Sequence, residues 1–428
     1  MRTQKELKLQ NTDHFKSKLL AWAQKYDEVV FLDSNEHSGN YHQFNGVLAA
    51  DAFTSIKTDA HLAFEDLHSY QSVTKDWVFG YLTYDLKNDT EPLCSGNFDG
   101  IQFPDLYFFQ PKKLIFIKDE EVVFNYLNVV AEEIIPDFEA IKQTQLNVPT
   151  EAAEIKIKLR IHRDAYIDKV EKMLDHIQRG DIYEANFCQE FYAEDTPINP
   201  LQTFWKLNDI SKPPFATFLK LDGNYLLSAS PERYLRKEGQ KVISQPIKGT
   251  AKRHLNEVKD DALKRALEED EKERSENIMI VDLVRNDLSH TAKRGSVAVE
   301  ELCKVYSFMQ VHQMVSTVSS TVKDDVSPVE IIKSTFPMGS MTGAPKISAM
   351  TIIEDLEVTR RGLYSGAVGY FTPENDFDFN VVIRSILFNS ETNYASFSVG
   401  SAITAKSQPI KEYKECLIKA KAMKLALE

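Results

Sequence analysis

The sequence predicts an α+β fold, in which strands and helices are mixed without the regular strand–helix alternation of a doubly wound parallel sheet. Three observations support this prediction. Short β-branched and aromatic runs recur along the whole chain, and amphipathic helical stretches are concentrated in its second part. The composition is that of an ordinary globular protein, since 43% of the 428 residues are hydrophobic and 27% are charged. A chain of this size can bury a large core.

The first third of the chain is expected to contain strands separated by polar turns. Three runs fit this interpretation, EVVFLDS at 28–34, WVFGYLTYDL at 77–86 and KKLIFI at 112–117. Residues 132–155 are acidic and lack a regular hydrophobic period, so we expect a connector there. A boundary near residue 150 therefore separates an N-terminal region, residues 1–150, from residues 151–428.

The second part carries denser helix and strand signals. Asp164 is a candidate N-cap for a helix that ends at Gly180 and carries its apolar residues on one face: Tyr166, Val170, Met173, Leu174 and Ile177. Strand-like runs follow at 182–191, 215–221, 224–230 and 241–247.

Three further helices are expected towards the C-terminus. A charged helical stretch covers about residues 254–288, and a second helix follows Pro345, since proline is tolerated in a first turn. The last helix begins near Ser407 and directs four residues inward: Tyr413, Leu417, Ala420 and Met423.

Charge and cysteine content exclude several classes of protein. The net charge of -13 and the pI of about 5.4 argue against a nucleic-acid binder. No apolar run approaches the roughly 20 residues that a membrane helix needs, and the N-terminus has no apolar signal segment. The four scattered cysteines predict neither a disulfide framework nor a zinc site, and a reducing cytoplasm is the simplest location.

Lys248 and Glu232 are candidate reactive residues. Lys248 follows a strand-like run and precedes Gly249-Thr250, where glycine allows the backbone to approach a ligand. A lysine whose amine loses its proton can act as a nucleophile, although an exposed lysine at a strand end is more common. Glu232 is a candidate general acid or base, although an ion pair with the adjacent Arg233 is the simpler expectation.

Carboxylates on two expected helices suggest a possible metal site. Glu276 lies where a charged stretch turns apolar. Glu415 and Lys419 are four residues apart, which is typical of a surface ion pair. Two helices that each present a carboxylate are also suited to Mg²⁺, which takes few protein carboxylates.

Arg384 interrupts the apolar run DFNVVIRSILF, where an arginine is costly unless it is paired. We therefore expect a carboxylate partner, from either the protein or a ligand. The small-residue turns at 339–343 and 399–402 could offer backbone N–H groups to an anion, although such patterns are not specific.

Several motifs occur in an order that resembles the chorismate-utilising enzymes. The motifs are SPER, PIKGT, SENIMIVDLVRNDL, GSMTGAPK, EDLEVTRRGLYSGAVGY and KEYKEC. The resemblance is strong from about residue 160 onward and looser before it, through FLDS and FGYLTYDL. It implies a single α/β body like that of anthranilate synthase component I, in which two antiparallel sheets pack face to face with helices outside. In such a body the N-terminal region interleaves with the chorismate-binding region.

Two positions distinguish the reactions within this family. The residue before Gly-Thr is alanine in anthranilate synthases and lysine in aminodeoxychorismate synthases, and here it is Lys248. Isochorismate synthases carry a lysine base where this chain has Glu184. The resemblance therefore implies amination of chorismate to 4-amino-4-deoxychorismate, for 4-aminobenzoate and folate biosynthesis. Anthranilate synthase component I, isochorismate synthase and a non-catalytic effector-binding subunit remain alternatives.

The resemblance also implies a role for each matching residue. Lys248 would attack C2 of chorismate and expel the C4 hydroxyl, and ammonia would then add at C4 and displace the lysine. Glu232 would be the general acid/base, His312 would contact the leaving hydroxyl, and Glu276 and Glu415 would hold Mg²⁺. The positions expected to bind substrate are Gly249, Thr250, Tyr364, Arg384, Gly400, Ser401 and Ala402.

Two further expectations concern partners and effectors. The chain has no recognisable glutaminase nucleophile, so a glutamine amidotransferase partner would supply ammonia, unless free ammonia is used. Four residues match a tryptophan-like pocket: Ser34, Pro214, Phe215 and Ala216. The chain departs from the family pattern at Glu184, Ala402 and Lys406, where glutamine, glycine and aspartate are usual. These departures affect the expected details of substrate binding and leave the reaction class unchanged.

Overall fold

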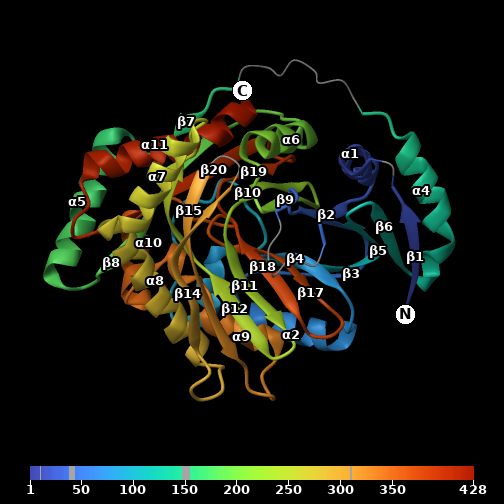
Figure 1. Ribbon diagram of the computed structural model, residues 1–428, viewed down its shortest axis with the longest axis horizontal. Helices are drawn as coiled ribbons and strands as arrows, with labels where there is room; N and C mark the ends of the chain where they lie inside the picture. Colours follow the sequence, from blue (N-terminus) through green and yellow to red (C-terminus); the bar gives the residue numbers. More distant parts are fainter. Residues whose placement is uncertain (10, 38–43, 147–154, 309–310) are drawn as a thin grey trace.

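The computed structural model describes the chain except for residues 10, 38–43, 147–154 and 309–310. It confirms the predicted α+β class (Figure 1). The strands of the described residues form one 20-stranded sheet, which has two arms. The pairings between neighbouring strands are antiparallel, as those between β10 and β9 and between β17 and β18 illustrate.

The first arm contains strands from the N-terminal, central and C-terminal parts of the chain. In spatial order it consists of β1 (Arg2–Lys8), β6 (Glu121–Leu127), β5 (Leu106–Lys118), β3 (Gly46–Thr58), β2 (Glu28–Asp33), β9 (Phe215–Leu221), β10 (Asn224–Ser230), β19 (Ser385–Asn389), β20 (Tyr394–Thr404) and β8 (Glu184–Ala193). The short strands β7 (Lys158–Leu159) and β16 (Gly343–Ala344) pair with β8.

The second arm begins beside β5. It consists of β4 (Val78–Leu82), β17 (Ala367–Phe371), β18 (Phe377–Val381), β11 (Arg233–Glu238), β12 (Lys241–Gln245) and β15 (Val311–Thr321). Both β13 (Ile247–Lys252) and β14 (Ala298–Ser307) pair with β15.

The arms face one another across a shared core but are joined through one long strand. Val47 and Leu219 of the first arm belong to the same buried cluster as Phe79 and Phe379 of the second. The expected two packed sheets are therefore present as two arms of one hydrogen-bonded sheet. They are joined because the first part of β5 pairs with β4 and its second part with β6.

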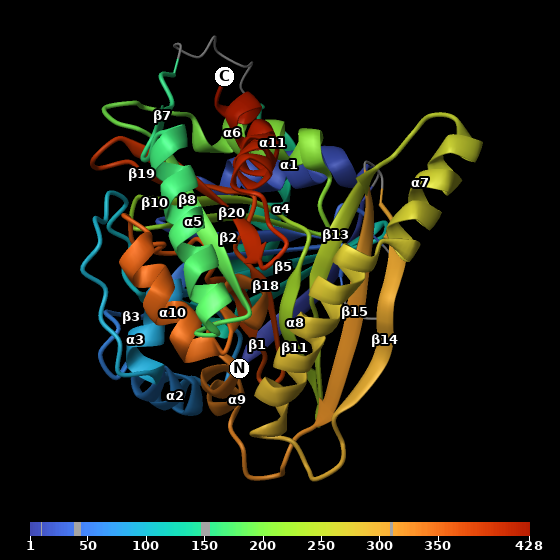
Figure 2. The same ribbon diagram turned by 90° about the vertical axis from the view of Figure 1, so that its left-hand side faces the viewer.

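Helices cover the outside of both arms (Figure 2). A second buried cluster joins the first arm to α1 (Thr12–Ala23), α4 (Ile134–Gln143), α5 (Arg163–Arg179), α6 (Pro200–Ser211), α10 (Lys346–Leu356) and α11 (Pro409–Leu427). The remaining long helices are α2 (Ala63–Thr74), α7 (Glu257–Glu269), α8 (Glu271–Ser289) and α9 (Pro328–Thr335), of which α8 lies against β15.

The connector expected at 132–155 is wrong for its first part, which forms α4. Ile134 and Ile141 are buried on one face of this helix, and buried Asp137 accepts a hydrogen bond from Tyr126 at 3.1 Å. Tertiary packing therefore stabilises a helix whose local sequence carries a weak period. The boundary proposed near residue 150 lies outside the described residues.

Three expected helix details also differ from the structure. Helix α5 begins at Arg163, so Asp164 lies in its first turn, where a carboxylate favours the helix dipole. The charged stretch forms two helices because the Asp270 side chain accepts from the N–H groups of Lys272 and Glu273, capping α8. In α11 the buried face runs through Cys416, Ala420 and Met423, which leaves Leu417 41% exposed.

The N-terminal 150 residues share their sheet with the rest of the chain. Strand β4 pairs with β17, and β2 pairs with β9. Among the described residues, no helix has the length and apolar character required to cross a bilayer.

Candidate active site

Lys248 lies near the start of β13, where its side chain reaches a buried carboxylate. Its Nζ is 3.4 Å from Oε1 of Glu184 on β8. Burial by itself would lower the pKa of Lys248, but the carboxylates of Glu184, Glu276 and Glu232 outweigh it and raise the pKa above the usual lysine range. In the resting protein the amine is therefore an ammonium ion, which must lose a proton before it can act as a nucleophile.

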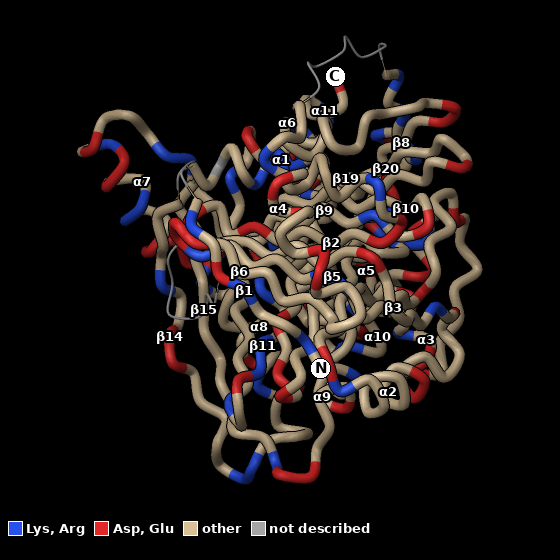
Figure 3. Tube along the Cα trace, turned by 90° about the vertical axis from the view of Figure 1, so that its right-hand side faces the viewer, with Lys and Arg blue, Asp and Glu red and all other residues tan. Residues whose placement is uncertain are grey.

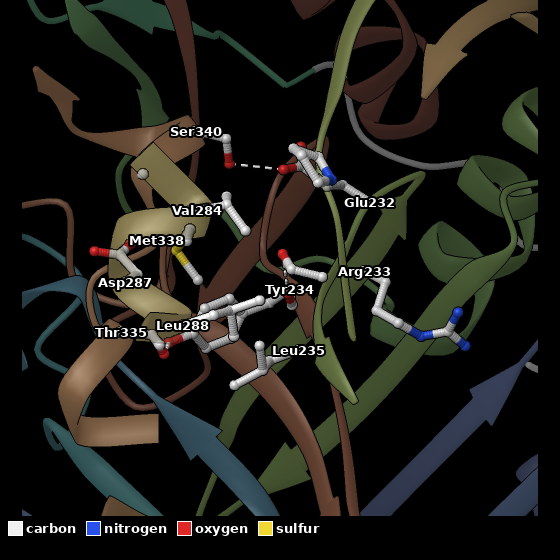
Figure 4. Close-up of a pocket in the computed structure, with 13 residues that line it drawn as sticks. Glu232, Arg233, Tyr234, Leu235, Val284, Asp287, Leu288, Thr335, Met338 and Ser340 are labelled. Atoms are coloured by element: carbon white, nitrogen blue, oxygen red, sulfur yellow. Dashed lines mark hydrogen bonds between the residues drawn. The ribbon is translucent and has the colours of Figure 1, made fainter. Parts of the chain in front are cut away.

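Glu232 follows β10 and lies 5% exposed beside the small-residue turn of residues 339–343. Ser340 donates a hydrogen bond of 2.6 Å from Oγ to Glu232 Oε1 (Figure 4). Burial raises the pKa of Glu232 to about 7, although Ser340, Lys248 and Arg384 act in the opposite direction. A carboxyl group with this pKa can donate and accept a proton near neutral pH.

The expected ion pair between Glu232 and Arg233 does not form. Arg233 points away from Glu232 (Figure 4) and donates to both carboxylate oxygens of Asp378, at 2.9 and 3.1 Å. A cavity of about 20 Å³ beside Glu232, lined partly by Tyr234 and Val284, is about the size of one water molecule. This largely apolar wall is consistent with the cost of ionising Glu232.

Arg384 does not lie within a strand as the sequence suggested. It occupies the turn between β18 and β19 with φ of 51°, in the left-handed region that non-glycine residues rarely adopt. In the described part of the chain its guanidinium has no hydrogen-bond or ion-pair partner. Desolvation lowers the pKa of Arg384 on balance, although the nearby carboxylate of Glu232 acts in the opposite direction. The carboxylate expected for this arginine is therefore not supplied by the described protein residues.

Glu276 and Glu415 lie on different helices but close to the same lysine. Oε1 of buried Glu276, on α8, accepts no hydrogen bond from the described residues and lies 3.6 Å from Lys272 Nζ. Burial raises the pKa of Glu276 to about 7. On α11, burial would raise the pKa of Glu415, but Lys419, at 2.7 Å, and the more distant Lys272 and Lys248 lower it on balance.

The donor chemistry of these two carboxylates is compatible with a magnesium ion. Oε1 of Glu276, which accepts no hydrogen bond from the described residues, and the second carboxylate from α11 are hard oxygen donors that share the field of Lys272. Among the described residues, no three His, Cys, Asp or Glu side chains form a closed metal cage. Mg²⁺ requires no such cage, because it usually keeps several waters and binds one or two carboxylates.

Gly249 is held in a conformation and a space that favour glycine. Its φ is 86°, and an added Cβ would lie 3.2 Å from Glu273 and Leu267 side-chain atoms. The next residue, Thr250, is exposed. The left-handed conformation and the close packing of Glu273 and Leu267 therefore favour glycine at this position.

The segment 399–402 is part of β20 and not a turn. Gly400, Ser401 and Ala402 pair with Cys188, Phe187 and Asn186 of β8. An added Cβ at Gly400 would lie 2.6 Å from Cys188 Sγ, and Ser401 donates to Glu412. The small residues therefore allow close packing within the sheet.

His312 and Tyr364 have partners of their own. The His312 ring nitrogens lie 2.9 Å from Ser307 Oγ and 3.1 Å from Asp260 Oδ1, so its described contacts do not reach Lys248 or Glu232. The Tyr364 hydroxyl lies 3.9 Å from Cys188 Sγ, and burial raises its pKa well above the usual value.

The structure brings the four residues of the tryptophan-like pocket together. Ser34, Pro214, Phe215 and Ala216 line one cavity of about 50 Å³, whose wall also includes Arg233. The guanidinium of Arg233 lies 4.9 Å from the centre of the Phe215 ring.

Two contacts at the site were not predicted from sequence. The sequence indicates Glu184 only as the replacement of a lysine, and residues 339–343 only as a source of backbone N–H groups. Ser340 and Glu184 instead provide side-chain contacts to Glu232 and Lys248. A polar side chain inside the small-residue turn was the one available signal for Ser340.

The site has a local balance of charge that differs from the acidic chain around it. Figure 3 shows acidic and basic residues interspersed along the trace. Positive charge within the site comes from Lys248, Lys272 and Arg384, and the three side chains lie near carboxylates. An anionic substrate would depend on these local cations, because the net charge of -13 does not attract it.

Comparison with known proteins places the chain among related sequences. The description "chorismate binding enzyme" belongs to the family that matches residues 4–425. Aminodeoxychorismate synthase component 1 of Bacillus subtilis is 31% identical over 391 residues, which cover 88% of this chain and 80% of that protein. A probable chloroplastic aminodeoxychorismate synthase of Oryza sativa subsp. japonica is 42% identical over 264 residues, or 61% of this chain. This chain spans only 29% of the rice protein.

A solved structure shares the fold. The crystal structure of anthranilate synthase component I from Streptococcus pneumoniae TIGR4 matches with a TM-score of 0.77 and 25% identity. The match covers 91% of this chain and 95% of that one.

Proposed function

The chain belongs to the family of chorismate binding enzymes, and from this membership we propose that it is an aminodeoxychorismate synthase component I. It would convert chorismate and ammonia to 4-amino-4-deoxychorismate, for 4-aminobenzoate and folate biosynthesis. The observation that carries the proposal is the position of Lys248. Its amine contacts Glu184 and lies within the electrostatic field of Glu232. Lys248 directly precedes Gly249, which adopts a left-handed backbone conformation.

In the proposed reaction Lys248 is the covalent nucleophile. Its neutral amine attacks C2 of chorismate, and Glu232 protonates the C4 hydroxyl, which leaves as water. Ammonia then adds at C4, displaces the lysine from C2 and returns a proton to Glu232. The pKa of Glu232, raised by burial to about 7, supports its role as the acid in the first step and the base in the second.

Other residues bind the anionic substrate. Arg384 would hold a substrate carboxylate, which is supported by the lack of a hydrogen-bond or ion-pair partner for its guanidinium among the described residues. Tyr364 and the backbone at Gly249-Thr250 and at 400–402 would complete the substrate wall. His312 would contact the leaving hydroxyl, as the resemblance implies, and its described contacts are with Asp260 and Ser307.

Glu276 and Glu415 would hold Mg²⁺. When bound, this ion would supply positive charge that neutralises the ring carboxylate and the charge developing during attack. The raised pKa of Glu276 and the lack of a hydrogen bond to its Oε1 among the described residues support the assignment.

Ammonia would come from a glutamine amidotransferase partner. The matching relative from Bacillus subtilis is named as a component 1, which supports a separate partner. The product would retain the enolpyruvyl group, because amination at C4 leaves that group in place.

The purified chain should form 4-amino-4-deoxychorismate when incubated with chorismate, Mg²⁺ and ammonium. The product is identified by mass and fluorescence. Lys248→Ala should abolish both turnover and any chorismate adduct on the intact protein. Anthranilate as the main product would instead support anthranilate synthase activity, the second candidate favoured by the Streptococcus pneumoniae structure. Isochorismate, or an adduct that survives in Lys248→Ala, would also overturn the proposal.

A further inference from the structure

Glu184 is placed at the start of β8 with its carboxylate inside the protein. Its backbone pairs with Thr404 of β20 and with Ala344 of β16, so strands on both sides hold it in position. It is 2% exposed. The strand therefore presents Glu184 to Lys248 from a rigid element, with little access to water.

The two carboxylate oxygens of Glu184 differ. Oε1 lies 3.4 Å from Lys248 Nζ, whereas buried Oε2 has no hydrogen-bond partner among the described residues. A buried, ionised carboxylate with one unsatisfied oxygen is costly.

The other carboxylates that face Lys248 are engaged elsewhere. Glu232 accepts from Ser340, Glu276 lies beside Lys272, and Glu415 is paired with Lys419. Glu273 on α8 acts on Lys248 only at longer range. Among the residues that the structure describes, Glu184 is thus the side chain that lies within hydrogen-bond distance of the Lys248 amine.

The carboxylates around Lys248 affect the protonation of its amine. Together Glu184, Glu276 and Glu232 raise the pKa of Lys248, which keeps its amine protonated at neutral pH. A protonated amine has no lone pair for attack on carbon. A base must therefore act on Lys248 during the reaction.

We propose that Glu184 is this base, a catalytic residue that takes a proton from Lys248 as the lysine attacks and returns it when the lysine leaves. The inference rests on the proposed function, because it requires Lys248 to become covalently attached to the substrate.

The proton and electron balance closes over one cycle. In the first half, Glu184 accepts a proton from the ammonium ion, and the freed lone pair of Lys248 forms the bond to C2. The ring double bonds shift towards C4, the C4–O bond breaks, and Glu232 protonates the departing hydroxide to give water.

In the second half, ammonia forms the C4–N bond and gives its surplus proton to Glu232. The double bonds shift back, the C2–N bond breaks with its electron pair on Lys248, and Glu184 returns the proton to the neutral amine. Chorismate and ammonia thus become aminodeoxychorismate and water without an oxidant or reductant.

Glu184→Gln tests the inference, because glutamine keeps the shape and an oxygen acceptor but cannot take a proton. With chorismate, Mg²⁺ and no ammonium, adduct formation is followed by quenched-flow intact-protein mass. At pH 7.5 the variant should form the adduct at least about 100-fold more slowly than the parent, with KM nearly unchanged. The ratio of its rate to that of the parent at the same pH should then rise about tenfold per pH unit up to pH 9.5, since hydroxide replaces the missing base.

Two controls separate proton transfer from a structural effect. Glu190→Gln removes another buried carboxylate of β8, which pairs with Arg160 and Tyr394 and not with Lys248. It should leave the pH profile of adduct formation unchanged even if it lowers the melting temperature. Glu184→Asp keeps a carboxylate and should retain the pH profile of the parent at a reduced rate.

The outcomes are distinguishable. Adduct formation in Glu184→Gln at the parental rate at every pH would overturn the inference. So would a folded variant that is slow to the same extent at every pH, since it would indicate positioning alone. A parent chain that forms no adduct and no amination product would refute the proposed function itself.

Discussion

Glu232 illustrates how single buried charges determine the properties of this site. In the folded state burial raises its pKa to about 7, from an ordinary value of 4.5. Between those two pH values the folded chain binds more protons at this position than the unfolded chain. The free energy of unfolding therefore falls as pH rises from about 4.5 to 7 and stays reduced above that range.

Glu232→Gln should therefore increase stability at pH 8 while it removes activity. Because glutamine stays neutral, the variant avoids the cost of a buried carboxylate, by up to about 3 kcal/mol at pH 8 and by much less at pH 5. Urea denaturation at both pH values measures the difference. Equal stability of variant and parent at pH 8 would contradict the burial argument.

Glu301→Gln is a control for the Glu232 variant, because the pKa of Glu301 is shifted in the opposite direction. Burial would raise the pKa of Glu301, but Lys304, Tyr306 and Thr317 lower it on balance. A lowered pKa contributes stability that is present at high pH and is lost as pH falls. This variant should therefore lose stability at pH 8, and the loss should shrink on acidification.

At the scale of elements, α4 shows how packing creates a helix that its own sequence signals only weakly. Its isoleucines at 134 and 141 lie against the first arm, and Asp137 meets Lys113 and Tyr126. Most of the stability of a ten-residue helix must come from such contacts, because helices this short are marginal alone.

Ile141→Ala should destabilise the protein by about 2–4 kcal/mol, because it leaves a cavity beneath a fully buried side chain. The matched control is Ile135→Ala on the same helix, where the side chain is 41% exposed and the change should cost less than about 1 kcal/mol. Denaturant unfolding of both variants compares them. Similar losses would show that α4 does not depend on its buried face.

At the scale of the molecule, the N-terminal third is part of the central sheet. Strand β5 joins the two arms, and pairings of β2 with β9 and of β4 with β17 link it to distant parts of the chain. Both arms fill one hydrophobic cluster. The first third therefore cannot bury its apolar surface without the remainder.

Residues 1–146 expressed alone should show no cooperative unfolding transition, because β2 and β4 would each lose a neighbouring strand. Mixing this fragment with residues 155–428 should restore a transition that neither fragment has alone. Circular dichroism during thermal denaturation measures it. A sharp transition for the N-terminal fragment by itself would instead support the boundary expected near residue 150.

Local sequence determined several strands and helices of this protein. The runs at 215–221 and 224–230 coincide with β9 and β10, and Gly180 ends α5 in the left-handed conformation. These features depend on side-chain period and backbone freedom, which neighbouring residues set. The order of the motifs likewise determined the family, and Lys248 determined which reaction within it we propose.

Tertiary structure alone decided the partners of the reactive groups. It separated Arg233 from Glu232, left Arg384 without a protein partner in the described residues, and brought Glu184 to Lys248 from a position 64 residues away in the chain. Charge and burial act through space, so the pKa values of Glu232 and Lys248 depend on strands and helices that are distant in sequence. No local pattern carries that information.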